Sequence, residues 1–547
     1  MYQLIKLIKN LENELQELVG PESISFRISN NPNFDFQINN LVKFQNHKKI
    51  KNIENSFYKI IDKESSITKF EITDNYFINL KINIETFTHN FDKIRNNIKV
   101  ENPQTILLDY GGPNIGKPLH VGHLRSLNIG RSLYRIYKLA GHNVLSDIHM
   151  GDWGMPIAQI ISYIDQNKID IDNINIDSLE KIYPKASNLY LEDNEFKELA
   201  QANNKMLNEN NSKIIKKWKK LREISIESIK DTLQVLNQQF DLWIGESDVN
   251  HLIPGMIKRL KDDEKISLDD GAYVSNFISD PKILITKSDG SYLYLTTDLA
   301  TVINRTKQNK VDKTLYIVDK RQKLHFEQLI KSIKYFEFSD KEYQHIAFGT
   351  VNDSNGNPYK TREGDAKKLI DLFKETSLKI KQINKDLDDD TNKLLANTVL
   401  TFSDLKTNRM TDYKFDLDKF TNISGKTGIY VQYALVRAKK LLNNASINTS
   451  TLDLNIPDFD ESDLNLTREL IKFEYFFNLA LENNEPHHLA DYLYELSNLF
   501  NSMYQNENIL ENKNEIVKFN KLKITEYFIA YSSLLMECLG LEPVEEM

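Results

Sequence analysis

Hydrophobic residues recur at two spacings along this chain, and the two spacings predict strands and helices in alternation. The apolar run from Thr105 to Tyr110 predicts a strand, and a helix-spaced pattern that ends before Gly141 follows it. The apolar positions of that helix are Leu124, Leu127, Ile129, Leu133, Ile136 and Ala140. The segment between them, rich in glycine and proline, predicts a tight turn from a strand into a helix N-terminus.

The same patterns extend to a larger sheet. Residues 104–170 predict strand, helix, strand and helix, with Pro156 in the first turn of the second helix, Ile157 to Ile164. This order is the first half of a doubly wound parallel sheet. Three later apolar runs predict its second half: Lys282 to Ile285, Leu315 to Val318 and Ile346 to Phe348.

Helical patterns interrupt and follow the sheet. Residues of about 171–284 are mostly helical in pattern, and from Leu369 the pattern is helical almost to the end. The N-terminal part has an amphipathic helix within 1–19 and short strands at Ser25 to Ile28 and Tyr76 to Ile84. We therefore predict an α+β domain over 1–98, an α/β domain over 99–368 split by helical insertions at about 171–284, and an all-α domain over 369–547.

Composition narrows the class of protein. A chain of 547 residues is too long to fold around one ordinary hydrophobic core, so we expect several domains. The single cysteine, Cys538, excludes an intramolecular disulfide and a multi-cysteine zinc site. One cysteine fits a reducing cytosol, and the longest apolar runs are too short to cross a bilayer. Glu12, Glu14 and Glu17 argue against a targeting peptide. We expect a cytoplasmic protein without a membrane segment.

The turn before the first long helix has the chemistry of an anion site. The first N–H groups of a helix are unpaired and its dipole is positive there, and His120 and His123 add donors. Gly122 has no Cβ, so a flat ring can rest against the backbone. The alternatives are structural histidines, or a metal site that lacks carboxylate or cysteine partners at ligand spacing. We predict an ATP site and no metal site.

Several sequence blocks in a fixed order carry a family resemblance. HVGH, residues 120–123, has the form of the HIGH signature of class I aminoacyl-tRNA synthetases, and the resemblance to the arginyl-tRNA synthetase family covers nearly the whole chain. The blocks are DYGGPNIGKPLHVGHLRSLNIGRSLYRIYKLAGHNV from 109, GDWG from 151, LYLTTDLA from 293, IVDKRQKLHFEQ from 317, FGTVNDSNGNPYKTREG from 348, TGIYVQYALVRAKK from 427, HHLADYLYELSNLFNSMY from 487 and the terminal LGLEPVEEM.

The resemblance implies a fold, a reaction and partners. It implies a Rossmann-like catalytic domain, an N-terminal additional domain that contacts the tRNA elbow, and a C-terminal anticodon-binding domain. It implies that arginine and ATP, which carries Mg²⁺, form arginyl-adenylate, and that the arginyl group then passes to tRNA(Arg). We expect no zinc and a monomer.

For ATP and catalysis, the resemblance implies residues in two elements. His120 and His123 should hold the phosphates, with Gly116 and Gly122 beside the nucleotide. The second element, Tyr359 to Gly364, departs from the KMSKS pattern of the class, and it offers Lys360, Thr361 and Arg362. Family members with such a degenerate loop usually carry a lysine just before the HIGH element. We therefore predict that Lys117 supplies the missing charge and that Lys360 assists.

For arginine, the resemblance implies a pocket with carboxylates, because a buried guanidinium is best met by bidentate carboxylates. By position, Asp109 and Asp298 are the candidates, with Tyr294 four residues before Asp298. An aspartate at a strand end is also a common cap or turn former. Asn114 should hold the ammonium or carboxylate end of the substrate, and Gln322 the far side of the pocket.

For tRNA, the resemblance implies contacts in both terminal domains. Phe77 and Asn79 match an aromatic and an amide that meet a tRNA base, although a buried core role for Phe77 is at least as well supported. Tyr430, Tyr433 and Arg437 match a tRNA-contacting helix, and helix packing explains them equally well. Because the net charge of the chain is −8, a surface that binds RNA has to be a local cluster of basic residues. The lysines of 213–220 with Arg222 form such a cluster, or a solvated helix face.

Two other function classes stay open at this point. Another HIGH-type ligase, such as cysteinyl-tRNA synthetase, is disfavoured by the lack of cysteine ligands for zinc. A non-catalytic tRNA-binding paralogue is disfavoured because His120, His123, Asp109, Asn114 and Asp298 are all present.

Overall fold

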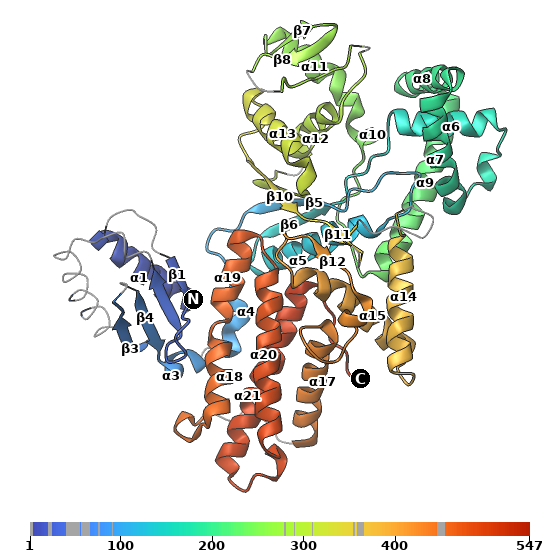
Figure 1. The fold of residues 1–547 in the computed structure, drawn as a ribbon. Coiled ribbons are helices and arrows are strands. Elements are labelled where there is room, and N and C mark those ends of the chain that lie inside the picture. The colour runs from blue at the N-terminus through green and yellow to red at the C-terminus, as the bar shows by residue number, and fades with distance from the viewer. Residues whose placement is uncertain are drawn as a thin grey trace. The chain divides into compact units, whose positions relative to one another are not determined.

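The chain folds into two compact units (Figure 1). The computed structural model describes residues 4–19, 25–39, 55, 59, 66–74, 77–89, 91–277, 281–288, 290–308, 310–353, 356–357, 366–445 and 454–547. One unit joins residues 1–100 with 422–547, and the other spans 101–421. No helix among the described residues is long and apolar enough to span a membrane.

A four-stranded parallel sheet organises the unit of residues 101–421. Its strand order is β10-β9-β5-β6, and every pairing is parallel. The chain runs from β5 to β6 on one side and later fills the other side with β9 and β10, so the order reverses between β5 and β9. The strands are β5 (Thr105–Tyr110), β6 (Asn143–Asp147), β9 (Lys313–Asp319) and β10 (Glu342–Phe348).

Helices follow β5, β6 and β9. Helix α5 (Leu124–Leu139) connects β5 to β6, and Gly141 takes a left-handed φ of 96° just after it. Helix α6 (Met155–Gln166) has Pro156 in its first turn, where the missing N–H removes no hydrogen bond. Helices α12 (Tyr294–Gln308) and α13 (Lys323–Tyr335) flank β9 in the chain.

One predicted strand of the sheet is wrong. Lys282 to Ile285 was expected to open the second half of the sheet, but it makes only an isolated antiparallel bridge between Val274 and Leu284. Ile283 and Ile285 are buried in an apolar cluster instead. A short apolar run has the same pattern in a buried loop as in a buried strand, so its length and composition did not distinguish the two.

The insertion between β6 and β9 contains two groups of elements. The first group is helical: α7 (Ile176–Glu192), α8 (Asn194–Asn208) and α9 (Ser212–Val235) pack with α6 (Figure 1). The second group holds α10 (Glu246–Val249), α11 (Ile253–Asp262) and a hairpin of β7 (Ile266–Asp269) and β8 (Ala272–Ser275).

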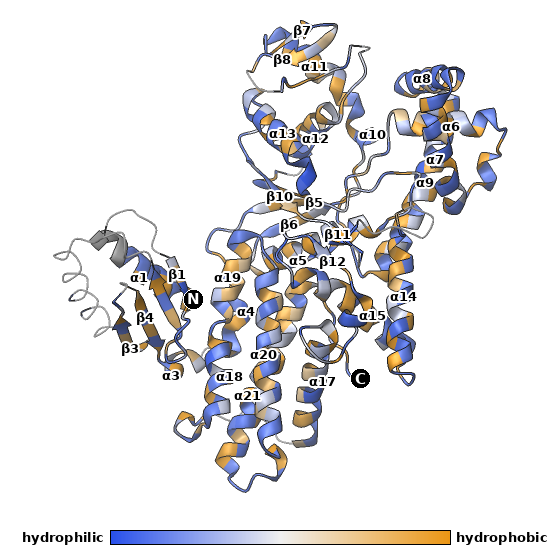
Figure 2. Cartoon of the chain, in the orientation of Figure 1, coloured by the Kyte–Doolittle hydropathy of each residue, from blue (hydrophilic) through white to orange (hydrophobic). Residues whose placement is uncertain are grey.

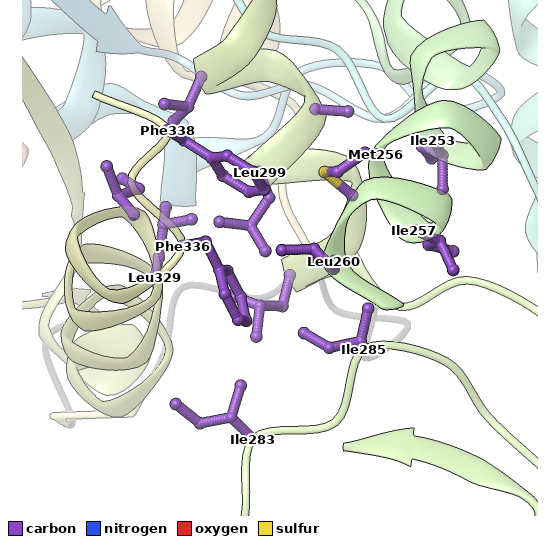
Figure 3. Close-up of a cluster of buried hydrophobic side chains, with 14 of the residues drawn as sticks. Ile253, Met256, Ile257, Leu260, Ile283, Ile285, Leu299, Leu329, Phe336 and Phe338 are labelled. Carbon is purple, nitrogen blue, oxygen red and sulfur yellow. The ribbon is translucent and has the colours of Figure 1, made fainter. Parts of the chain in front are cut away.

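A single apolar cluster joins the second group to the helices around the sheet. It includes Val249 of α10, Met256 and Leu260 of α11, and Leu299 of α12, all nearly or fully buried. Figure 3 shows Met256 and Leu260 of α11 facing Leu299, Leu329 and Phe336. Burying a side chain of this size contributes roughly 1.5–3 kcal/mol. The cluster therefore fixes α10 and α12 against each other.

The end of this unit contains α14 (Leu369–Ile383), α15 (Asp389–Leu405), α16 (Leu417–Phe420) and the two-residue strands β11 (Val351–Asn352) and β12 (Tyr413–Lys414). Helix α15 packs against α5, where Arg125 and Asp404 form a fully buried ion pair of 2.9 Å. Short 3-10 helices lie at Val121–His123, Ile171–Asn173, Asn250–Leu252 and Lys320–Gln322.

The other unit combines the two chain ends. Its N-terminal part has an antiparallel sheet of order β1-β2-β4-β3 with helix α1 (Leu4–Val19). The strands are β1 (Ser25–Ile28), β2 (Phe36–Asn39), β3 (Ile67–Ile72) and β4 (Ile78–Ile82), followed by α3 (Ile84–Thr88), the 3-10 helix Phe91–Lys93 and α4 (Ile94–Asn97).

Five long helices make the C-terminal part of this unit, and hydrophobic and hydrophilic residues alternate along them (Figure 2). They are α17 (Gly428–Ala445), α18 (Glu461–Ile471), α19 (Phe473–Asn483), α20 (His487–Asn506) and α21 (Glu515–Leu539), with 3-10 helices at Ile456–Asp458 and Ile509–Glu511. The all-α pattern expected for this end of the chain is confirmed.

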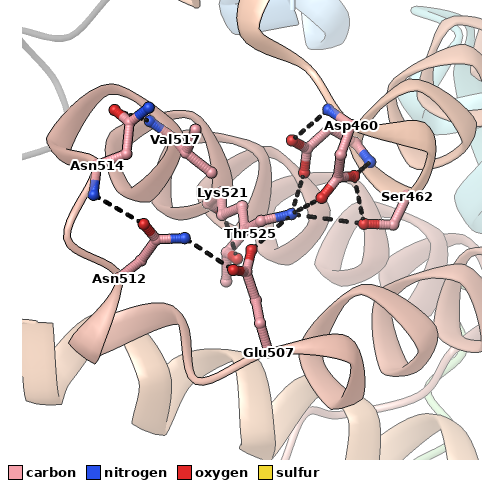
Figure 4. Close-up of polar contacts among 9 residues, drawn as sticks. Asp460, Ser462, Glu507, Asn512, Asn514, Val517, Lys521 and Thr525 are labelled. Carbon is pink, nitrogen blue, oxygen red and sulfur yellow. Dashed lines mark hydrogen bonds and ion pairs between the residues drawn. The ribbon is translucent and has the colours of Figure 1, made fainter.

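A buried lysine ties three segments of these helices together (Figure 4). Lys521 of α21 has no exposed side-chain surface and contacts Asp460 at 2.6 Å, Asp463 at 2.8 Å and Glu507 at 3.2 Å. Asp463 is itself fully buried. Burial raises the pKa of Asp463, against the lowering effect of the Lys521 ammonium. The ammonium is therefore required to keep several carboxylates close together.

We expect Lys521→Met to destabilise this unit by about 3–5 kcal/mol, because it leaves a buried carboxylate without its cation. Chemical denaturation followed by circular dichroism measures the change. The control is Lys518→Met, one turn earlier on the same helix, where the ion pair to Glu515 is long, 3.9 Å. Equal stability of the two variants would contradict a structural role for the buried network.

Candidate functional site

The site lies at the carboxyl ends of the parallel strands, where their order reverses. Asp109 of β5 pairs in register with Asp147 of β6 and with Tyr316 of β9, and Tyr316 pairs with His345 of β10. Side chains in one such row point to the same face of a sheet. Ligands of open α/β sheets bind at this type of position.

The turn after β5 ends in two histidines that cap the helix for each other. The backbone N–H of Gly122 donates to His120 Nδ1 at 3.0 Å, and the backbone N–H of His120 donates to His123 Nδ1 at 3.1 Å. The two ring centroids are 4.0 Å apart. A Cβ on Gly122 would lie 2.7 Å from the His120 ring, so the ring that rests on this glycine is that of His120.

Both rings are neutral at pH 7. Burial, followed by the nearby His120, lowers the pKa of His123 to about 3, and burial followed by Lys117 lowers the pKa of His120. His120 Nδ1 accepts the N–H of Gly122, so the proton of that ring lies on Nε2. His123 Nδ1 lies 3.1 Å from the backbone nitrogen of His120 and 3.2 Å from its carbonyl oxygen, so it can accept from the first or donate to the second. The pair offers dipoles, without net charge, to an anion.

The positive charge of this corner comes from Lys117. Its Nζ lies 3.7 Å from the centre of the Tyr183 ring, on helix α7. The preceding Gly116 has a φ of 84° and donates its N–H to Ser225 Oγ at 2.9 Å. A Cβ on Gly116 would lie 2.7 Å from Ile160, so the close packing of the turn requires a glycine here.

The second predicted phosphate element, Tyr359 to Gly364, lies outside the described residues, so the roles predicted for Lys360, Thr361 and Arg362 stay predictions. The chain that follows it, from Lys367, is hydrogen-bonded to the histidine turn. The N–H of Val121 donates to Lys367 O at 2.9 Å, and that of Leu369 donates to Leu119 O at 2.9 Å.

Two carboxyl groups, Glu246 of α10 and Asp298 of α12, lie close enough to repel each other. Burial, then Asp298, then Asp152 raise the pKa of Glu246 to about 8. Glu246 also acts on Tyr294, whose pKa is raised by burial, then Glu246, then Tyr183. Asp298 is held by His325, with 2.6 Å between Nε2 and Oδ2. A cation would relieve the repulsion between these carboxylates.

A buried network sets the position of Glu246. The fully buried Asp152 accepts hydrogen bonds from Arg222 Nε at 2.7 Å and from the N–H and Oγ of Ser247 at 2.9 and 2.8 Å. The N–H of Glu246 donates to Met150 O at 3.0 Å. The segment from Gly151 to Gly154 therefore supports the backbone around Glu246 through Asp152.

Asp109 forms an ion pair within the chain. Its carboxylate, with that of Asp147, contacts Arg305 Nη2 of α12 at 2.6 Å, and all three side chains are buried. The chain's own guanidinium therefore occupies the Asp109 oxygen expected for substrate. One positive and two negative charges leave a net negative charge, and Asp109 and Asp298 both act on the buried Tyr316. A direct contact between Asp109 and substrate stays a prediction.

The two remaining predicted pocket residues are exposed. Asn114 bridges Gly151, and its Oδ1 fills the space that a Cβ on Gly151 would need. Gln322 ends the 3-10 helix that follows β9 and is exposed. Sequence reasoning missed Glu246, because Gly245-Glu246-Ser247-Asp248 has the pattern of an ordinary helix cap. The apolar, strand-like run of residues 240–244 before it is the sequence feature that could have drawn attention to Glu246.

The predicted tRNA contacts of the N-terminal part lie on β4 and just before it. Phe77 is half-buried, and Asn79 is 2% exposed and accepts hydrogen bonds from Gln37 at 2.8 Å and Ser29 at 3.2 Å. The amide oxygen of Asn79 is therefore engaged within the domain.

The predicted contacts of the C-terminal part lie together on α17. Arg437 donates to Tyr433 Oη at 2.7 Å and to Asn501 at 2.6 Å, and its guanidinium lies 4.9 Å from the Tyr504 ring centre. Tyr430 lies 5.4 Å from Tyr494, ring centre to ring centre. These contacts serve helix packing, and the tRNA roles stay predictions.

One group of potential metal ligands occurs among the described residues. Glu485, His487 and His488, at the start of α20, have ligand atoms within 4.8 Å of one another. His488 Nε2 is already paired with Glu485 at 3.1 Å. The expectation of no zinc is not tested by this arrangement.

We expect Gly245→Ala to destabilise the unit of residues 101–421 by about 1–3 kcal/mol, since its Cβ would lie 2.5 Å from Asp152 Oδ1 inside a fully bonded network. Thermal unfolding measures the shift. The control is Gly255→Ala, on α11, where a Cβ meets nothing within 4 Å and helix propensity favours alanine by up to about 1 kcal/mol. A neutral Gly245→Ala would argue against a rigid Asp152 network.

Two known protein families match this chain. The family described as tRNA synthetases class I (R), catalytic domain, matches residues 86–417, and the DALR anticodon binding domain matches residues 431–547. The arginine–tRNA ligase of Agathobacter rectalis is 35% identical over 482 residues, which cover 81% of this chain and 80% of that protein. That of Francisella tularensis subsp. holarctica is 34% identical over 517 residues and covers 89% of both chains.

Solved structures agree with the sequence relatives. The arginyl-tRNA synthetase of Plasmodium falciparum matches with a TM-score of 0.83 and 26% identity over 100% of both chains. The arginyl-tRNA synthetase of Thermus thermophilus shares the fold, with a TM-score of 0.79 and 19% identity over 99% of both chains. From its paired domains, its relatives and the geometry of its site, this chain belongs to the arginyl-tRNA synthetase family of the class I aminoacyl-tRNA synthetases.

Proposed function

We propose that this chain attaches L-arginine to tRNA(Arg) and that Glu246, Asp298 and Tyr294 select the guanidinium. The observation that carries the proposal is the mutual repulsion of Glu246 and Asp298, which with burial raises the pKa of Glu246 to about 8. Such a site favours a ligand that brings a permanent positive charge. A guanidinium keeps its charge at every physiological pH and presents a planar fork of donors.

The remaining pocket residues complete the recognition of arginine. Asn114 holds the ammonium or carboxylate end, and Gln322 closes the far side. Asp109 acts through the net negative charge of its cluster with Arg305 and Asp147. Lysine has a compact charge and only three donors, so it satisfies the two carboxylates less well than arginine does.

ATP binds along the turn from Gly116 to His123. The Nε2–H of His120 and the ring of His123 meet phosphate oxygens, and Gly116 and Gly122 lie beside the nucleotide. Lys117 supplies the net charge, assisted by Lys360, with Thr361 and Arg362 in the same loop. Mg²⁺ arrives with ATP and offsets phosphate charge; the residues of this corner are donors and cations, which suit the phosphate oxygens rather than the metal.

The reaction has two displacements. The arginine carboxylate attacks the α-phosphorus, the bond to the bridging oxygen breaks, and pyrophosphate leaves. A ribose hydroxyl at the tRNA 3′ end then attacks the carbonyl of the adenylate, forms an ester and releases AMP. The protein positions the reacting groups and offsets the charge on the phosphate oxygens.

Partners and organisation follow from this reaction. The domain over 1–98 contacts the tRNA elbow through Phe77 and Asn79, and the domain over 369–547 contacts the anticodon region through Tyr430, Tyr433 and Arg437. The domain over 99–368, with its insertion at about 171–284, carries the chemistry. The enzyme acts as a cytoplasmic monomer and needs no zinc.

Arginine-dependent pyrophosphate exchange tests the function and the acidic pair together. With tRNA(Arg) present, we expect exchange with arginine and with no other standard amino acid. Glu246→Gln should raise the KM for arginine about 100-fold, since losing a charged hydrogen-bond partner costs about 3 kcal/mol. Glu223→Gln removes an exposed carboxylate of α9 and serves as the control. Exchange with a different amino acid would overturn the assignment.

The pH dependence of arginine binding checks the same residue independently. The carboxylate of Glu246 must be ionised to pair with a guanidinium, so arginine affinity should rise about tenfold per pH unit between pH 6 and 7.5 and level off near pH 8. Calorimetry in buffers of different ionisation enthalpy should show release of one proton. A pH-independent affinity in the wild-type protein, or the same profile in Glu246→Gln, would exclude this role.

Lys117→Ala should slow adenylate formation at least 100-fold, because it removes the described cation of the phosphate corner. Single-turnover pyrophosphate release in the presence of tRNA measures this step. Lys185→Ala, an exposed lysine two residues from Tyr183, is the control. Normal adenylate formation by Lys117→Ala would assign the charge to the loop of Lys360 alone.

A further inference from the structure

Helix α7 of the insertion contacts the histidine turn and its neighbours through three polar side chains. Asp177, Glu180 and Tyr183 follow one another at intervals of three residues, so each is a surface neighbour of the next. The two acids bind Lys368, which forms a backbone bridge with the histidine turn, and the tyrosine contacts Lys117. Two lysines beside this turn therefore meet the same helix.

The two lysines have partners of different chemistry on this helix. Lys368 Nζ lies 2.6 Å from Glu180 and 3.2 Å from Asp177, so two carboxylates neutralise its charge. Lys117 Nζ lies 3.7 Å from the centre of the Tyr183 ring, and among the residues that the structure describes it forms no ion pair. An aromatic face attracts an ammonium through its quadrupole but carries no net charge. The charge of Lys117 is therefore left for another anion.

The Tyr183 ring packs against the glycine turn. A Cβ on Gly116 would lie 3.6 Å from Cδ2 of Tyr183, so the ring rests beside the backbone of the residue just before Lys117. The ring also packs against a buried apolar cluster that includes Ile115 of the turn and Ile160 of α6. Side chains in such a cluster have little freedom to move. The ring therefore has a fixed place relative to the turn, and a cation that contacts it is positioned as well.

The ammonium and the ring are close to groups of both proposed substrate sites. Burial, and then the charge of Lys117, lowers the pKa of His120 in the phosphate corner. Burial, then Glu246, then Tyr183 raise the pKa of Tyr294 in the arginine pocket. Tyr183 is therefore near the place where the ATP phosphates and arginine have to meet.

We propose that Tyr183 is a positioning residue for ATP, whose ring holds the Lys117 ammonium beside the phosphates and leaves its charge to them. A carboxylate in place of the ring would hold the lysine but cancel its charge, as the two acids of α7 do for Lys368. An aliphatic side chain would leave the charge but would not fix its position. The inference rests on the proposed function, in which Lys117 offsets the charge of the ATP phosphates.

Arginine-dependent pyrophosphate exchange at varied ATP, with tRNA(Arg) present, tests this role in the full-length protein. Tyr183→Leu should lower kcat/KM for ATP about tenfold, the size of a partly desolvated contact between an ammonium and a ring. The KM for arginine should change less than about twofold, because the ring acts through the phosphate cation. Tyr183→Phe keeps the ring and should retain wild-type use of ATP. Phenylalanines with increasing fluorine substitution at position 183 should lower it stepwise, because fluorine withdraws electrons from the ring face and barely changes the shape of the ring.

A double variant separates positioning from packing. In a Lys117→Met background, Tyr183→Leu should cause no further loss, because the cation that the ring holds is already gone. Tyr190→Leu, two turns further along α7, is the matched control and should use ATP like the wild type.

Three results would overturn the inference while the wild type exchanges with arginine. They are an equal loss from Tyr183→Leu with and without Lys117, a Tyr183→Leu variant that uses ATP as well as or better than the wild type, and a fluorinated series without a trend. The fluorinated series decides the matter if Tyr183→Leu fails to fold, because each member keeps the shape of the ring. A wild-type protein that shows no arginine-dependent exchange would refute the proposed function instead.

Discussion

The central constraint on this structure is that the half-buried carboxyl groups of Glu246 and Asp298 lie close enough to influence each other. Glu246 meets this constraint by retaining a proton until about pH 8, and Asp298 by its contact with His325. Asp152, Ser247 and Arg222 fix the backbone around Glu246, so this group cannot move away from its neighbour. In the proposed function, a guanidinium takes the place of the proton on Glu246.

The local elements near the phosphate corner could be predicted from the sequence because their causes are local. The strand of 105–110, the glycine turn and the helix that ends before Gly141 follow from side-chain periodicity and from conformations that glycine allows. The strand predicted at Lys282 to Ile285 was wrong because of tertiary packing. Ile283 and Ile285 are buried in the apolar cluster around α11 and α12 and not in the sheet.

The charged partners within the site were harder to predict, because they join segments far apart in the chain. Arg305 pairs with Asp109 although the two residues are 196 positions apart in the sequence, and the residues around Asp109 give no sign of this contact. Glu246 has the sequence surroundings of a helix cap, and only burial and the approach of Asp298 distinguish it. The contact between Lys117 and the Tyr183 ring also joins distant segments, so it was equally hard to predict from the sequence. The family resemblance indicated which residues belong to the site, and the structure showed which residues they contact.

The apolar cluster shared by α10, α11 and α12 limits which parts of the insertion can be shortened. Glu246 and Asp298 lie on either side of a 51-residue stretch, from Ser247 to Thr297, that also contains the β7–β8 hairpin. Val249, Leu260 and Leu299 belong to one buried cluster, which ties the two acids to a common support. A deletion that keeps Glu246 beside Asp298 therefore has to spare α10, α11 and α12, and the tip of the hairpin is the part left to remove.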